Sequence, residues 1–484
     1  MGHTKQSKFT KFHIAFALIL MFFAGHVVPP IYPITTVGMQ ILGVFLGVIW
    51  LWCFVGFLWP SLLALVAFSL TDFGSFNQML TMSFGHSVPI LLLFSMILFG
   101  SPQHVGATKY ITRWFLSKDV FNNKPIVFAF VFFFATYALS VAVNVTPSLI
   151  LMWNVLYSIL NDLGFKKGDR FTSLMIVGTF LGAISGQASL PFSGSTLAIL
   201  SIFETTADMT MPIAEYILLG FIFSVVVFVA YCLFMKVILK PNELTKVAAI
   251  NSNMFNQNPL PPMNKIQKAN FLGMLSFVFL MLLPTFLPDA FVITVFLNRL
   301  GATGVAMFLT AIMCLIKVED QPILDFPQVA KSAVSWDIFI MVATAMAIAT
   351  ALTHESTGVL SGMLLLFEPI LGGHTQIGFF IIMLLFGIVV TSFASSMVIG
   401  IAMMPILVAF GTSAGAILPA VAATTTLLIH YSIILPSASV FAAMLWSNEE
   451  WITPGEVFKY GGIIVAIAVV VAIIIIMPIS LMLF

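Results

Sequence analysis

The sequence predicts an all-α polytopic membrane protein built as an inverted repeat of two halves, each with a re-entrant helical hairpin and a discontinuous helix. Of the 484 residues, 60% are hydrophobic and only 8% are charged, whereas soluble domains carry about 25% charged residues. Apolar runs such as 217–235 and 461–484 supply the roughly 20 residues that a membrane-spanning helix requires. Small polar clusters interrupt apolar runs in the same order in both halves, as in many secondary transporters.

The chain begins with an apolar run that we interpret as a retained first helix over 12–31. Lys5, Lys8 and Lys11 precede it, and no small-residue cleavage pattern follows. The positive-inside rule then puts the N-terminus in the cytoplasm of a multi-pass protein of the cell membrane. Further segments are predicted at 36–70 in two pieces, 83–101, 125–160, 171–203, 216–239, 269–286, 290–316 with an interruption at Asn298-Arg299, 335–352, 375–411, 414–446 and 457–484.

A polar stretch rich in asparagine, ending in PLPP at 259–262, divides the chain. It is too polar for a membrane helix, so we interpret it as a loop between two halves. The expected organisation is N-terminal scaffold helices over 1–80, a first repeat over 81–240 with a hairpin near 125–160, the loop over 241–268, and a second half over 269–484 with a hairpin near 375–411.

The predicted hairpins are apolar runs too long for one crossing. The first carries NVTPS at 144–148 in its middle, and the second carries small polar residues at 391–396. Proline lacks an N–H and disfavours helix in the residue before it, so Thr146 is the predicted tip of the first hairpin. Unpaired backbone at membrane depth is tolerated only where it is buried in protein or lines a cavity, so both tips are expected to face a ligand.

Each half also contains a Leu-Pro pair followed by small hydroxyl residues, LPFSGS at 190–195 and LPSAS at 435–439. Hydroxyl and carbonyl oxygens suit a hard cation such as sodium, and free N–H groups at helix N-termini attract an anion. A carboxylate transported with sodium would use both. The sequence has no nucleophile motif, phosphate loop or metal-ligand spacing, and its three cysteines lie in apolar segments. We therefore expect neither an enzyme nor a cofactor.

Ionisable residues inside the apolar runs are few, and such residues are functional hypotheses by default. For His86, which opens an apolar run, an interfacial position is favoured. For His430, in TTTLLIHYSIILPS, a site residue and a packing residue both stay open. Asp and Glu are absent from the interior of every predicted segment, which argues against a carboxylate proton relay. We interpret Gly182 and Gly186 as points of close helix contact.

The sequence resembles the divalent anion/sodium symporters of the ion transporter superfamily. That family has a Ser-Asn-Thr motif at each hairpin tip, and NVTPS at 144–148 resembles the first copy. The residues that resemble the second copy are Thr391, Ala394 and SSM at 395–397, followed by Pro405. Val145 and Ser396 stand where the family has asparagine, and Met397 replaces the second threonine. The stretches SWDIFIM at 335–341 and ITPGEVFKYGG at 452–462 are also similar to family landmarks, so the resemblance covers most of the chain from about residue 80.

The resemblance implies a homodimer held together by scaffold domains, with transport domains that carry substrate by an elevator movement. It implies a sodium ion beside each hairpin tip and a substrate between the tips and the Leu-Pro turns. The implied sodium ligands are Ser140, Asn144 and backbone near Phe192 at the first site, and Thr391, Ala394, Ser395, Ser396 and backbone near Ala438 at the second. The implied substrate-binding residues are Asn144, Val145, Thr146, Ser193, Ser195, Ser395, Ser396, Met397, Pro436, Ser437 and Ser439.

We therefore expect a secondary active transporter of a small anion, such as a di- or tricarboxylate or a related organic or inorganic anion. The expected mechanism is sodium-coupled symport by elevator-type alternating access. The expected partners are the anion, membrane lipid and a second copy of the chain, with no nucleic acid. Two alternatives stay open, which are an uncoupled facilitator or exchanger and a proton-coupled anion transporter.

Overall fold

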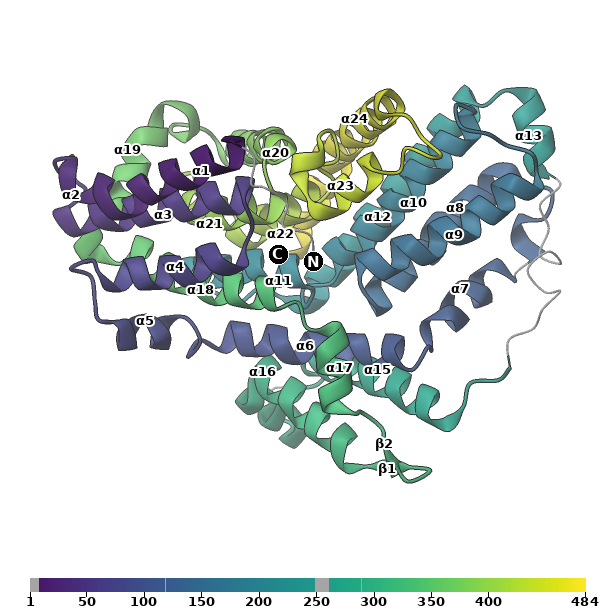
Figure 1. Cartoon of the computed structure of the whole chain (residues 1–484), viewed down its shortest axis with the longest axis horizontal. Coiled ribbons are helices and arrows are strands. Elements are labelled where there is room, and N and C mark those ends of the chain that lie inside the picture. Colours follow the sequence, from purple (N-terminus) through teal and green to yellow (C-terminus); the bar gives the residue numbers. More distant parts are fainter. Residues whose placement is uncertain (1–7, 118, 249–260, 289) are drawn as a thin grey trace.

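The computed structural model describes residues 8–117, 119–248, 261–288 and 290–484 and is almost entirely helical (Figure 1). Twelve helices among the described residues are long and apolar enough to cross a membrane. The one pair of strands in these ranges is a short hairpin, β1 (Lys317–Val318) and β2 (Gln321–Pro322). The predicted all-α polytopic class is therefore confirmed.

The N-terminal part consists of helices of very unequal length. The elements are α1 (Lys8–Ile19), the π-helical turn η1 (Leu20–Ala24), α2 (Gly25–Val27), α3 (Thr36–Phe54), α4 (Leu58–Ser69), α5 (Phe76–Met82), α6 (Ser87–His104), α7 (Thr108–Leu116) and η2 (Asp119–Phe121). The single segment predicted over 36–70 is divided into α3 and α4, as expected. The short helices α5 and α7 had no counterpart in the predicted segments.

The first half continues with two helix–break–helix units. The elements are α8 (Pro125–Ala142), α9 (Val145–Asp162), α10 (Arg170–Ser189), α11 (Gly194–Ala207) and α12 (Ile213–Ile238). The breaks fall at 143–144 and 190–193, within the predicted hairpin and at the predicted Leu-Pro turn. The re-entrant position of α8 and α9 in a membrane stays a prediction.

The second half repeats this order of broken helices. Its elements are α13 (Pro241–Ala248), α15 (Lys265–Phe286), α16 (Val292–Leu315), α17 (Phe326–Ala333), α18 (Trp336–Thr353), η3 (Glu355–Thr357), α19 (Val359–Leu371), α20 (Gln376–Phe393), α21 (Ser396–Ser413), α22 (Leu418–Ile429), η4 (Pro436–Ala438), α23 (Val440–Trp446), α24 (Pro454–Val471), η5 (Ala472–Ile476) and α25 (Met477–Leu483). The breaks at 394–395 and 430–439 correspond to those of the first half.

Two predicted boundaries differ from the structure. The interruption expected at Asn298-Arg299 lies within α16, and the non-helical residue is Gly301, with φ 61° and ψ 177°. Glycine populates positive φ without steric cost, which explains the displacement. The predicted polar loop over 241–268 contains α13 and the first turn of α15, while its residues 249–260 lie outside the described residues.

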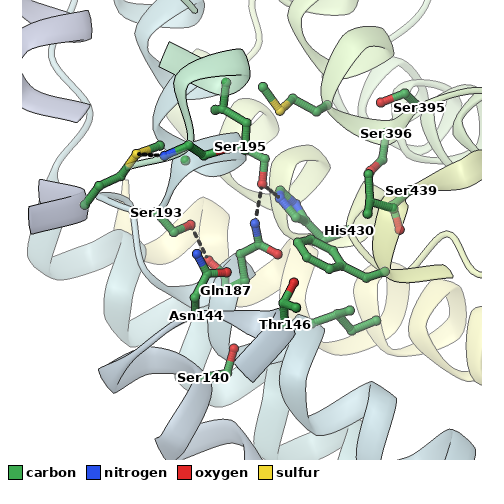
Figure 2. A pocket seen from close by; sticks show the side chains of 18 of the residues that line it. Ser140, Asn144, Thr146, Gln187, Ser193, Ser195, Ser395, Ser396, His430 and Ser439 are labelled. Atoms are coloured by element: carbon green, nitrogen blue, oxygen red, sulfur yellow. Dashed lines mark hydrogen bonds between the residues drawn. The ribbon is translucent and has the colours of Figure 1, made fainter. Parts of the chain in front are cut away.

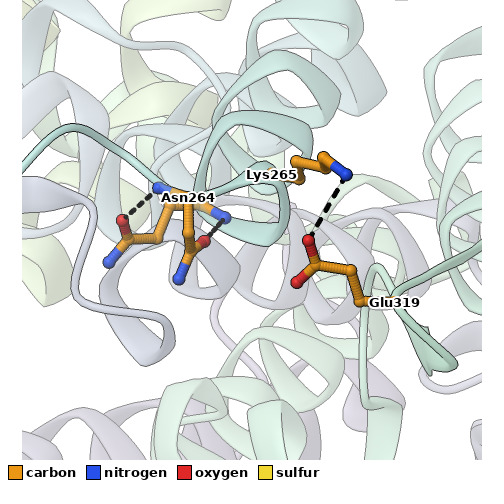
Figure 3. Close-up of polar contacts among 4 residues, drawn as sticks. Asn264, Lys265 and Glu319 are labelled. Atoms are coloured by element: carbon orange, nitrogen blue, oxygen red, sulfur yellow. Dashed lines mark hydrogen bonds and ion pairs between the residues drawn. The ribbon is translucent and has the colours of Figure 1, made fainter.

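The start of α15 is set by a capping box (Figure 3). The Asn264 side chain accepts from the Gln267 N–H at 2.8 Å, and the Gln267 side chain accepts from the Asn264 N–H at 3.1 Å. Two N–H groups without helical partners are thereby satisfied. The nearby ion pair of Lys265 and Glu319, 3.5 Å long, is exposed and contributes about 0–1 kcal/mol.

Helix α10 is enclosed by its neighbours, and its residues from Phe171 to Ser189 are all buried. It packs closely on α8 through Gly178, Gly182 and Gly186. A Cβ atom added at Gly186 would lie 2.5 Å from the Tyr137 carbonyl oxygen. Small residues spaced four apart let two membrane helices approach at backbone distance, so the predicted close contact at Gly182 and Gly186 is confirmed.

The break between α10 and α11 and the break between α22 and α23 lie between two helix pairs, α8–α9 and α20–α21. In Figure 1, α8 and α9 lie toward the right and α21 toward the left, with α11 and α22 near the centre and α20 above them. Packing of α11 against both α21 and α22 connects the two halves. The four breaks are thus brought into one region of the molecule.

Candidate anion-binding site

A cavity of about 770 Å³ lies where the four breaks meet. Sites for small ligands typically occupy about 300–1,000 Å³. The walls come from both halves: the tips of the α8–α9 and α20–α21 pairs, the two Leu-Pro turns, the end of α3, and α6 with the start of α18. Such a position, enclosed by both halves of the chain, is typical of the substrate site of a secondary transporter.

The structure brings most of the predicted site residues to this cavity (Figure 2). Among the expected substrate ligands, those that line it are Asn144, Thr146, Ser193, Ser195, Ser395, Ser396, Met397, Pro436, Ser437 and Ser439. The predicted sodium ligands Ser140 and Phe192 line it too. Four predicted residues are not among the lining residues: Val145, Thr391, Ala394 and Ala438.

The first tip is built around Asn144, two residues earlier than the predicted tip at Thr146. Asn144 has an extended backbone, with φ 171° and ψ 164°, and its Oδ1 accepts from the Val145 N–H at 2.6 Å. Its carbonyl accepts from the Ser148 hydroxyl at 2.6 Å. Pro147 falls in the first turn of α9, where a missing N–H is tolerated, so it does not end the arm as expected. Val145 is turned into the protein interior and is fully buried.

The second tip is supported from behind by Thr391. Its hydroxyl donates to the Gly387 carbonyl at 2.7 Å and lies 2.6 Å from the Ser432 hydroxyl. Ser437 in the Leu-Pro turn donates to the Phe393 carbonyl at 3.0 Å, which ties the turn to the end of α20. Thr391 is therefore a buried neighbour of the tip, one layer away from the cavity.

Among the helices that begin at the cavity wall are the three that follow the breaks at 143–144, 190–193 and 394–395: α9, α11 and α21. Their N-cap residues are Asn144, Ser193 and Ser395, and all three line the cavity. The side chains of Ser193 and Ser395 make no capping hydrogen bond. A helix N-terminus carries roughly half a positive charge, and its first N–H groups have no helical partner. The arrangement therefore presents backbone donors and partial positive charge to the same space.

The cavity contains no fixed side-chain charge. None of the lining residues in the described chain is Lys, Arg, Asp or Glu, and His430 is the one histidine among them. Groups of three or more His, Cys, Asp or Glu side chains that could hold a metal ion are likewise absent from the described residues. An anion in this cavity would be held by helix ends, hydroxyls and amides, with its countercharge supplied by another bound species.

The lining residues Gln187 and His430 are outside the predicted ligand set and bond to one that is in it, Ser195. Gln187 Nε2 donates to the Ser195 hydroxyl at 2.8 Å, and His430 Nε2 lies 3.0 Å from that hydroxyl (Figure 2). The sequence left His430 open between site and packing, and its position on the cavity wall favours the site. Gln187 carries no signal in the sequence beyond its place just before a Leu-Pro turn.

Comparison with solved structures gives a similar fold. The structure of Neisseria gonorrhoeae MtrF, described as illuminating a class of antimetabolite efflux pumps, aligns with a TM-score of 0.58 and 14% identity. The alignment covers 96% of this chain and 94% of that chain. No curated protein matches the chain in sequence.

Comparison with protein families identifies one that matches most of the chain. The CitMHS family, described as citrate transporters, matches residues 45–429, about four fifths of the chain. The match includes both helix pairs and the α10–α11 break. It makes the protein a secondary transporter of citrate-like anions rather than an enzyme. The chain belongs to the CitMHS family of citrate transporters.

Proposed function

We propose that this protein is a sodium-coupled symporter of a citrate-like carboxylate that works by elevator-type alternating access as a homodimer. The observation that carries the proposal is the convergence of three helix N-termini on a cavity without charged side chains. The carboxylate would accept hydrogen bonds from the first turns of α9, α11 and α21. Each such N-terminus stabilises a nearby negative charge by about 0.3–1 kcal/mol, and by up to about 2 kcal/mol in partly buried geometries.

Sodium provides the countercharge in this proposal. Transfer of a multivalent anion into an uncharged, partly dehydrated cavity is costly unless the charge is paired. Oxygen atoms suited to a hard cation surround both tips. The proposed ligands are Ser140, Asn144 and backbone near Phe192 at the first site, and Thr391, Ala394, Ser395, Ser396 and backbone near Ala438 at the second. The buried hydroxyl pair of Thr391 and Ser432, 2.6 Å apart, supports a polar second site.

The distribution of basic residues supports a cytoplasmic N-terminus. Contacts join the end of α6 to the start of α15, and the start of α10 to the end of α12: Gln267 Nε2 donates to the Val105 carbonyl at 3.0 Å, and Arg170 Nη1 donates to the Ile238 carbonyl at 2.9 Å. The basic residues beside these helix ends are Lys109, Arg113, Lys124, Lys166, Lys167, Arg170, Lys236, Lys240, Lys246, Lys265 and Lys268.

Basic residues are fewer at the opposite helix ends, where Arg299 lies one turn from Thr303, whose hydroxyl donates to the Ser87 carbonyl at the start of α6. The loops there are tied by Thr35, whose hydroxyl donates to the Ser356 carbonyl at 2.8 Å, and by Gln40, which donates to Asp72 at 2.9 Å. The segments 28–35, 70–75, 208–212 and 354–358 contain no Lys or Arg. By the positive-inside rule the basic end is cytoplasmic. The start of α1 lies beside the end of α3, where Trp50 bonds to His13, and so at the opposite end of α3 from Thr35.

The two sides of the cavity are formed by different sets of helices, and this asymmetry supports the proposal of alternating access. On one side stand the tips and turns of α8–α11 and α20–α23, and on the other stand α6 and the start of α18. Movement of the first set past the second would carry a bound anion with it. The homodimer and the elevator form of this movement rest on the resemblance to divalent anion/sodium symporters.

Uptake of radiolabelled citrate into proteoliposomes tests the proposal. We expect accumulation above equilibrium when sodium outside exceeds sodium inside, and none when potassium replaces sodium at equal pH on both sides. Accumulation driven by a pH gradient without sodium would replace sodium coupling by proton coupling. Equilibration without any ion dependence would identify an uncoupled facilitator, and absence of citrate uptake under every condition would refute the substrate class.

A further inference from the structure

The His430 side chain connects the end of α22 to the start of α11 at the cavity wall. It follows the last residue of α22, and its Nδ1 lies 2.7 Å from the Thr426 carbonyl oxygen four residues earlier. Its Nε2 lies 3.0 Å from the Ser195 hydroxyl and 3.4 Å from the Thr196 hydroxyl, both in the first turn of α11. The ring is only 8% exposed. One side chain of the second half thus contacts a helix N-terminus of the first half.

The partners of the ring determine which nitrogen carries the hydrogen. A carbonyl oxygen only accepts, so Nδ1 must donate to Thr426. In a neutral imidazole the other nitrogen is then an acceptor. The Ser195 hydroxyl already accepts from Gln187 Nε2 at 2.8 Å, which leaves its own hydrogen free to donate to His430. The bonds therefore run in one direction, from Gln187 through Ser195 to His430 and on to Thr426.

This chain of bonds keeps the first turn of α11 open. The Ser193 hydroxyl donates to the Gln187 carbonyl at 2.8 Å, and the Thr196 hydroxyl donates to the same carbonyl at 3.1 Å. The Ser193 side chain, directed to the end of α10, makes no capping hydrogen bond to the N–H groups that begin α11. Gly194 and Ser195 of this turn line the cavity, so an anion bound there would be close to their uncapped N–H groups.

We propose that His430 is a positioning residue for the anion, because its Nε2 lone pair holds Ser195, and with it the first turn of α11, in the arrangement that receives a carboxylate. The inference rests on the proposed anion transport and deepens it by assigning a role to a side chain outside the predicted ligand set. His430 itself is not required to contact the anion.

Two substitutions separate this role from simple support of the fold. In His430→Gln, the side-chain amide reaches the position of Nε2 and can still accept from Ser195, while the bond to Thr426 is lost. In His430→Asn, the shorter amide retains the bond to Thr426 and loses Ser195. We expect the Kd for citrate, measured by titration of the purified full chain in sodium, to rise about tenfold in His430→Asn and less than threefold in His430→Gln, about the effect of one hydrogen bond.

Melting temperature without citrate should follow the opposite order, because His430→Asn retains the bond at the end of α22. A residue that merely supports the fold would give the same order in both measurements, and that result would overturn the proposal. Wild-type affinity in both variants would also overturn it. If the wild type itself fails to bind citrate at any sodium concentration, the proposed function fails and this inference falls with it.

A double-mutant cycle tests the connection through Ser195. Ser195→Ala alone should weaken citrate binding, and adding His430→Asn should cause little further loss because both changes interrupt the same chain of bonds. Additive losses would contradict the proposal. Ser201→Ala is the matched control, since Ser201 is a buried serine of α11 roughly two turns further along and outside the cavity lining. Its Kd for citrate should equal that of the wild type.

Discussion

A single methyl group added at Gly186 should disturb both the stability of the protein and its anion site. The new Cβ would lie 2.5 Å from the Tyr137 carbonyl oxygen and 2.8 Å from Ser140 Cβ. Ordinary contacts of a Cβ atom begin at 3.4 Å, so α8 must move away from α10 by roughly 0.9 Å. Both neighbouring atoms are held in place by the helical backbone of α8, so neither can move aside by a side-chain rotation. Overpacking of this kind costs about 1–3 kcal/mol.

The control is Gly462→Ala in α24, where an added Cβ meets nothing within 4 Å. Both variants gain about 0.5–1 kcal/mol because alanine has lower conformational entropy to lose in a helix. The difference between the two therefore isolates the overpacking term. We expect Gly186→Ala to melt below Gly462→Ala and to bind citrate more weakly, because displacement of α8 moves Ser140 and Asn144 at the cavity wall. Equal melting temperatures would refute the close packing of α8 on α10.

Three further predictions address the ions, the first tip and the topology. Thr391→Ala and Ser189→Ala each remove a buried hydroxyl that is paired with another hydroxyl, at 2.6 and 3.1 Å respectively, so both variants should lose about 1–3 kcal/mol of stability. Only Thr391→Ala should raise the sodium concentration that gives half-maximal uptake. Identical sodium titrations of the two variants would contradict the second sodium site. Asn144→Ala should lower the stability of the protein by about 1 kcal/mol, because the N-cap of α9 is lost, and should also weaken citrate binding. The control Ser75→Ala removes the N-cap of α5 and should lower stability alone. Equal citrate affinities of the two variants would exclude Asn144 from the site. In a cysteine-free background, a membrane-impermeant thiol reagent should label Thr210→Cys in intact cells and Lys240→Cys only after permeabilisation, because α12 separates the two positions; the reverse pattern would invert the proposed topology.

The polytopic fold and the places where helices break could be predicted because each leaves a local signal. Excess length of an apolar run, with small polar residues in its middle, predicted the breaks at Asn144 and Ala394 to within a few residues. The first tip lies two residues before the predicted one, because Pro147 is in the first turn of α9 and does not end an arm. Proline is equally at home in the first turn of a helix, and the sequence gives no means of choosing between these positions.

The contacts across the cavity could not be predicted, because they depend on how the two halves pack. Thr391 and Ser395 lie four residues apart, yet Thr391 bonds to Ser432 behind the tip while Ser395 lines the cavity. Ser193 and Ser195 were expected as direct ligands, whereas their hydroxyls are already bonded to Gln187 and His430. The sequence pattern therefore indicates which residues lie near the site. Which of their polar atoms remain available to a ligand depends on how the two halves of the chain pack together.

The serine hydroxyls at the start of α11, which were expected to bind the anion, form hydrogen bonds to other groups of the protein. The hydroxyls of Ser193 and of its neighbour Thr196 donate to the Gln187 carbonyl, and the Ser193 side chain does not cap the first N–H groups of α11. Backbone N–H groups are lost only on substitution by proline, and they carry no charge that would have to be neutralised when the cavity is empty. A site built from them also tolerates the replacement of motif asparagines by Val145 and Ser396, because its donors belong to the main chain. Affinity for the anion should then depend more on residues that keep the helix ends open, such as Gln187 and His430, than on the hydroxyls that face the ligand.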